Sequence, residues 1–200
     1  MMRGIHRPLL RRALLAFAIT CLTVLGCGSD EKGAGPSVER ERRTESLSAG
    51  QIAGVVAVIN QSEMTQAQAA RPRLQDDDVR AFADKLMTDH RDADTELATL
   101  QEKVDADTQS SNMQREIALL GQNMARHVDR ESQELVDPTF LEVQVFMHRK
   151  AIMTVEQQLL PQATQPELRA YLENFLGKLR AHLERATQLR KRFPDVDFPR

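Results

Sequence analysis

Four segments with helical patterning each place one ionisable side chain in line with their apolar residues. In "FADKLMTDHRDAD", residues 82–94, His90 falls eleven positions after Val79. At about 100° per residue, positions seven or eleven apart return to within roughly 20° of the same helix face. The residues found in this way are Glu63, His90, His148 and His182. A carboxylate or imidazole on such a face must be paired, hold water or bind something, because burying it alone costs stability.

One glutamate and three histidines are suited to a single transition-metal ion. Imidazole binds zinc, copper, iron and nickel, and a carboxylate adds charge, so we expect zinc or copper. Asp89 and Asp94 lie close to His90 in the chain. They are expected to orient the metal-binding imidazoles without binding the metal themselves. Three nearby methionines would favour copper, although methionine in a helical core is more often a filler. These are Met64, Met87 and Met147.

Two other interpretations of the four residues stay open. The first is a structural network of hydrogen bonds that fixes how the helices pack, with no ligand. The second is a catalytic centre, but no catalytic motif in the sequence justifies naming a reaction, so we do not expect an enzyme. His6 and His127 lie outside the four patterned positions and receive no functional interpretation.

The elements that must position these residues are long helices. The first is expected over about 48–70, and the second begins at the acidic run 76–78, whose carboxylates can cap free N–H groups. The third is expected to begin with Asp137 as cap and Pro138 in the first turn. The fourth is expected at "TQPE", with Thr164 and Glu167 at capping-box spacing.

Four apolar stripes predict an all-α protein built as a four-helix bundle. The link between the second and third helices, residues 105–136, has apolar periodicity of its own and is expected to be a helical crossover. A crossover of that length can run the length of the bundle, which predicts a ferritin-like topology. With a rise of about 1.5 Å per residue, this topology brings the four residues within roughly two helical turns of one another.

The first 26 residues have the features of a secretory signal. Four arginines precede a short apolar run that ends in "VLGC", which resembles the lipobox of bacterial lipoproteins. We expect cleavage before Cys27 and lipidation of that cysteine, with cleavage of an ordinary signal peptide as the alternative. Residues 27–46 are then the lipidated cysteine and a tether, 47–193 the helical domain and 194–200 a C-terminal tail.

Processing also limits the classes of partner. The signal removes four arginines and no acidic residue, which takes the formal charge from −2 to −6. An acidic protein is a poor ligand for nucleic acid, because affinity for phosphates comes mainly from basic side chains. The expected partner is the membrane, through the lipid anchor. Gly28 replaces the aspartate that retains such proteins in the inner membrane, so we expect the outer membrane, facing the periplasm.

Over roughly residues 48–192 the chain resembles the family catalogued as domain of unknown function 4142, bacterial envelope proteins with a ferritin-like bundle. The resemblance is carried by Glu63, by "FADKLMTDH" with Asp89 and His90, and by "LRAHL" with His182. Asp137, Phe140 and His148 carry it in the third helix. It implies fold and compartment but no activity.

Comparison with di-iron bundles excludes one kind of centre. Those proteins place a glutamate three residues before each of two histidines and add two further glutamates. Here Met87 and Leu179 stand three residues before His90 and His182. We therefore expect no di-iron centre. The expected function is an envelope lipoprotein with a metal- or ligand-binding core, in metal handling or envelope stress; the alternative is a structural or interaction protein of the outer envelope without a ligand.

Overall fold

A computed structural model describes residues 45–104, 106–196 and 198. This part of the chain forms five α-helices and no strands, which confirms the all-α prediction. The helices are α1 (Ala49–Ala70), α2 (Asp77–Val104), α3 (Asn112–Arg130), α4 (Val136–Thr154) and α5 (Pro166–Arg190). A π-helical turn, Val155–Leu159, and a 3₁₀ turn, Leu160–Gln162, continue α4. The expected signal, Cys27 and the tether as far as residue 44 lie outside the described residues.

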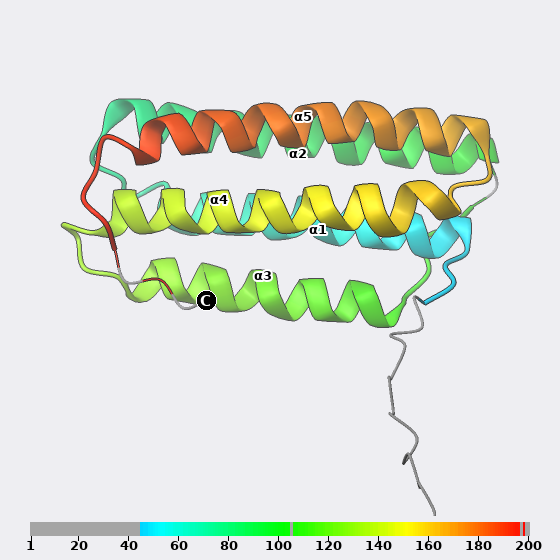
Figure 1. Cartoon of the computed structure of the whole chain (residues 1–200), viewed down its shortest axis with the longest axis horizontal. Coiled ribbons are helices and arrows are strands. Elements are labelled where there is room, and N and C mark those ends of the chain that lie inside the picture. Colours follow the sequence, from blue (N-terminus) through cyan, green and yellow to red (C-terminus); the bar gives the residue numbers. More distant parts are fainter. Residues whose placement is uncertain (1–44, 105, 197, 199–200) are drawn as a thin grey trace, which may run out of the picture. The chain divides into compact units, whose positions relative to one another are not determined.

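The helices lie side by side with their axes aligned (Figure 1). α2 packs against α5, α1 packs against α2 and α4, and α3 covers α1 and α4 on the side away from α5. The segment between the second and third predicted helices thus contains a helix, α3, which contributes Ile117 and Met124 to the core. Among the described residues, no helix combines the length and the apolar content needed to span a bilayer.

The first two helices begin where the sequence predicts. Ser48 caps α1 by accepting a hydrogen bond from the backbone of Gln51, whose side chain accepts one from the Ser48 backbone in return. The carboxylate of Asp76 accepts hydrogen bonds from the backbone N–H groups of Asp78 and Val79. Both arrangements satisfy N–H groups that have no partner inside a helix.

The predicted caps of the other two helices are wrong. α4 begins one residue before Asp137, and the Asp137 carboxylate instead accepts backbone hydrogen bonds from Gln75 and Asp76. This contact places the start of α4 beside the loop from α1 to α2. α5 begins at Pro166 without a side-chain cap. Proline fixes its own backbone for the first helical position and keeps the preceding Gln165 extended, so Thr164 lies too far out to cap the helix.

A buried polar layer divides the core. One apolar cluster contains Ile59, Ala93, Ala151 and Leu179, and the other contains Ala67, Leu86, Met147 and Ala186. α1, α2, α4 and α5 each pass from one cluster to the other through fully or nearly fully buried polar residues. These are Asn60, Glu63 and Gln66 on α1, His90 on α2, Gln144 and His148 on α4, and His182 on α5.

Candidate metal site

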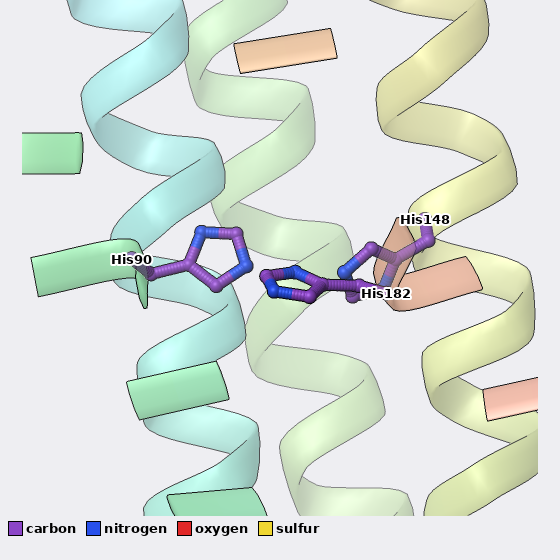
Figure 2. A group of neighbouring side chains, drawn as sticks. All are labelled: His90, His148 and His182. Atoms are coloured by element: carbon purple, nitrogen blue, oxygen red, sulfur yellow. The ribbon is translucent and has the colours of Figure 1, made fainter. Parts of the chain in front are cut away.

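Three histidines from three helices meet in the polar layer. One ring nitrogen each from His90, His148 and His182 lies within 4.8 Å of the others. The ring centroids are 5.9 Å apart for His90 and His148, and 5.3 Å apart for each of these and His182. The rings project from α2, α4 and α5 toward one another (Figure 2). All three side chains are buried.

In each ring, one nitrogen is hydrogen-bonded to the protein. Nδ1 of His148 donates to the backbone oxygen of Gln144 at 2.9 Å. Nε2 of His182 donates to the carboxylate of Asp89 at 2.7 Å. A carbonyl oxygen and a carboxylate can only accept, so these two nitrogens carry the proton of the neutral ring.

The tautomer of His90 is fixed through a longer chain of hydrogen bonds. Its Nδ1 lies 2.9 Å from Oδ1 of Asn60. The amide nitrogen of Asn60 donates to the Asp94 carboxylate at 2.7 Å, which turns the amide oxygen toward His90. His90 therefore also donates through Nδ1. Asp94 is thus linked to His90 through Asn60 and not by direct contact.

The remaining three ring nitrogens have no hydrogen-bond partner. They are Nε2 of His90, Nε2 of His148 and Nδ1 of His182, and all are buried. Because the opposite nitrogens carry the protons, each of these presents a lone pair and no donor. A buried acceptor without a partner costs about 1–3 kcal/mol. A group of three buried acceptors without a donor has the chemical character of a cation-binding site.

The distances fit a metal after a small contraction. Zinc–nitrogen bonds of about 2.0–2.1 Å in tetrahedral geometry place two ligand nitrogens roughly 3.3 Å apart. One nitrogen from each ring lies within 4.8 Å of the others, so these nitrogens would have to approach by no more than about 1.5 Å. Hydrogen bonds from the opposite ring nitrogens to a carboxylate or carbonyl are the usual support of metal-bound histidine.

Burial keeps the three histidines neutral, which is the form that binds a metal. Burial and, to a lesser extent, the nearby His182 lower the pKa of His148 to about 3, against the hydrogen bond to Gln144. Burial also lowers the pKa of His90, and His148 and His182 add to the effect. The pKa of His182 is lowered by burial as well, against the hydrogen bond to Asp89, which favours the charged form.

Glu63, the fourth residue singled out by the sequence, lies beside this group and outside it. Its Oε1 is 3.7 Å from Nδ1 of His148, the nitrogen that is bonded to Gln144. Both carboxyl oxygens are buried without a hydrogen-bond partner. Burial raises the pKa of Glu63 to about 8, with Gln144 opposing the rise, so the carboxyl group is protonated at neutral pH.

The uncharged residues of the buried polar layer were not predicted from the sequence. Asn60 holds His90, and the Gln144 side chain donates to Gln66 at 3.0 Å. Asn60 and Gln144 could have been found from their spacing, since Asn60 stands three residues before Glu63 and Gln144 four before His148. Of the methionines, Met147 belongs to an apolar cluster and Met87 packs against it.

Comparisons with known proteins identify one family. No curated protein and no solved structure matches the chain. The family model described as Domain of unknown function (DUF4142) matches residues 35–189, which is more than half of the 200 residues. The chain therefore belongs to the DUF4142 family, a domain of unknown function.

Proposed function

We propose that this protein binds one divalent transition-metal ion through His90, His148 and His182. The single observation that carries the proposal is the group of three adjoining buried histidines, each of which has one ring nitrogen without a hydrogen-bond partner. Three neutral imidazoles suit zinc, and also copper, cobalt or nickel. A bound cation would give the three nitrogen lone pairs the partner that the described residues do not provide.

The proposed site has three protein ligands. Glu63 contacts the side of His148 that is already bonded to Gln144, so a fourth ligand to the metal would be water or a small anion. The helices are proposed to form a ferritin-like bundle with α3 as its crossover. A di-iron centre is not part of the proposal, because the histidine group contains no carboxylate ligand.

The proposed setting is the bacterial outer membrane. It rests on the lipobox-like "VLGC" and on Gly28 in the sequence. Lipidation at Cys27 would anchor the helical domain on the periplasmic side, where it would handle metal ions that reach the envelope. No reaction is proposed, and nucleic acid is not a proposed partner, because the expected mature chain is acidic.

Metal titration with elemental analysis tests the proposal. The full chain, purified in detergent and stripped with a chelator, should take up one equivalent of Zn²⁺. His148→Ala should abolish stoichiometric uptake. His127→Ala is the matched control, because His127 is a half-buried histidine of α3 outside the group and should leave uptake intact. Absence of uptake by the unsubstituted chain would favour the alternative, a purely structural polar layer.

A further inference from the structure

The surface between α2 and α5 is hollowed directly over His182. The hollow has a volume of about 460 Å³, and Asp89 and His182 are among its lining residues. His90 and His148 are not part of this lining. His182 is therefore the member of the metal-site group that borders this space.

We propose that metal ions reach the three histidines through this α2–α5 hollow, with the Asp89 carboxylate as their first ligand. This inference rests on the proposed metal site and adds the path into it. Asp89 is 24% exposed at its side chain and is bonded to Nε2 of His182 at 2.7 Å. It thus contacts both solvent and the site. Rotation of the His182 side chain would open the way for an ion from Asp89 to the other two histidines.

The hollow is large enough for a hydrated ion. Six waters at roughly 30 Å³ each occupy on the order of 180 Å³, well below the space available. A second pocket, between α1, α3 and α4, reaches Glu63 but has a volume of only about 10 Å³. That is close to the smallest space that can hold one water molecule. Its wall is mostly apolar, with Ile59, Ile117 and Leu120, so it is a poor path for a charged ion.

Charges around the hollow are mixed, and acidic neighbours offset part of the repulsion that a cation would meet there. Three basic side chains line it, and each has an acidic neighbour. Lys85 lies 2.9 Å from Asp89, Lys178 lies 2.9 Å from Glu96, and Arg185 lies 3.8 Å from Asp78. Among the lining residues, Asp89 is the one carboxylate. An arriving ion would displace Lys85 from Asp89, an exchange of one cation for another at a partly exposed carboxylate.

Gly177 is consistent with a functional role for the α2–α5 hollow. It lies in the middle of α5 and lines the hollow. A Cβ atom added there would meet nothing within 4 Å, so close packing does not require glycine. Glycine inside a helix costs roughly 1 kcal/mol relative to alanine. The absence of a side chain keeps the hollow open beside Asp89.

Metal-exchange kinetics on matched variants test this path. Ala181 is exposed and lines the hollow, so Ala181→Leu should fill it without disturbing the core. Ala170→Leu is the control. Ala170 is also exposed on α5 and lines a neighbouring hollow of about 470 Å³ that contains none of the three histidines. Gly177→Leu fills the first hollow from a second position. The measurements are Zn²⁺ uptake and its release to a colorimetric chelator, on the full chain.

Ala181→Leu and Gly177→Leu should slow uptake and release alike by about tenfold, because they obstruct the path and not the bound state. The Kd should stay unchanged, and Ala170→Leu should exchange at the original rate. Asp89→Asn, which can still accept the hydrogen bond from His182, should slow uptake. Unchanged exchange in both filled variants, with Zn²⁺ still bound, would overturn the path alone. Failure of the unsubstituted chain to bind Zn²⁺ would overturn the path and the proposed function together.

Discussion

Asn60 on α1 accepts a hydrogen bond from Nδ1 of His90 on α2, at 2.9 Å, inside the polar layer. Asn60 lies on the side of His90 away from the unpartnered Nε2, and its own amide is held by Asp94. This relationship fixes which nitrogen of His90 is protonated. The orientation of the candidate site therefore depends on an uncharged residue of α1, a helix that supplies none of the three histidines.

Substitution of Asn60 should weaken metal binding without touching a ligand. Asn60→Leu removes the acceptor for His90 Nδ1, so the ring loses its fixed tautomer and orientation. Loss of such support typically lowers metal affinity by about 10–100-fold. Competition with a chelator of known affinity measures the change. Asn174→Leu, at an exposed position of α5, is the control and should bind Zn²⁺ as tightly as the unsubstituted chain.

Bound metal should stabilise the fold, and removal of metal should reverse the effect. At a free Zn²⁺ concentration about a hundred times the Kd, the free energy of unfolding should rise by roughly 2.7 kcal/mol. Urea unfolding with and without Zn²⁺ measures the difference. His127→Ala should retain the increase and His148→Ala should lose it. An equal increase in His148→Ala would place the bound ion elsewhere.

The metal-free protein should be most stable between about pH 4.5 and 6.5, where the opposing effects of His148 and Glu63 cancel. The pKa of His148 is about 3 in the fold against an ordinary value of 6.5, so its contribution is present above pH 6.5 and is lost as the pH falls toward 3. The pKa of Glu63 is about 8 against 4.5, so its contribution is present below pH 4.5 and is lost as the pH rises toward 8. Stability should therefore decline on both sides of the maximum.

Glu63→Gln isolates one side of that profile. The amide does not ionise, so the fall in stability between about pH 6.5 and 8 should shrink or vanish, and the fall on the acid side should remain. Urea midpoints of the two metal-free proteins across this pH range give the comparison. If the variant declines as steeply as the unsubstituted chain, Glu63 is not the group responsible.

Two helical glycines should respond in opposite directions to alanine. Gly177→Ala should stabilise the protein by about 0.5–1 kcal/mol, because the new methyl group meets open space and alanine favours the helix. Gly121→Ala should destabilise it, because the methyl group would be forced against the Ser62 side chain of the packed helix α1. Thermal unfolding of both variants without metal measures the pair. Stabilisation by both substitutions would contradict the close packing of α3 on α1.

Much of the helical fold was predictable, because it follows from periodicity and local capping. Asp76 caps α2 as the acidic run predicts, and α1 begins close to the predicted residue 48. Asp137 was assigned to a helix start, but its carboxylate binds the backbone of a loop about sixty residues earlier in the chain. Such a tertiary contact leaves no local pattern. The same limit applies to Thr164, whose capping role depended on the backbone of the residue before Pro166.

The convergence of the three histidines was also predictable, since each continues an apolar stripe at a similar depth. The position of Glu63 relative to the histidines could not be predicted. Spacing along the apolar stripe gives the height of a side chain in the bundle but not which side of a neighbouring ring it contacts. Glu63 shares the layer but meets His148 on its Nδ1 side. The burial of Asn60 and Gln144 was not predicted, because asparagine and glutamine on a helix usually lie at the surface.

Anomalous diffraction at the zinc absorption edge, from crystals of the protein grown with excess Zn²⁺, shows whether the three histidines bind a metal ion. We expect one strong peak about 2.0–2.1 Å from Nε2 of His90, Nε2 of His148 and Nδ1 of His182. A histidine group that holds only water, with no anomalous peak between the three rings, would contradict it.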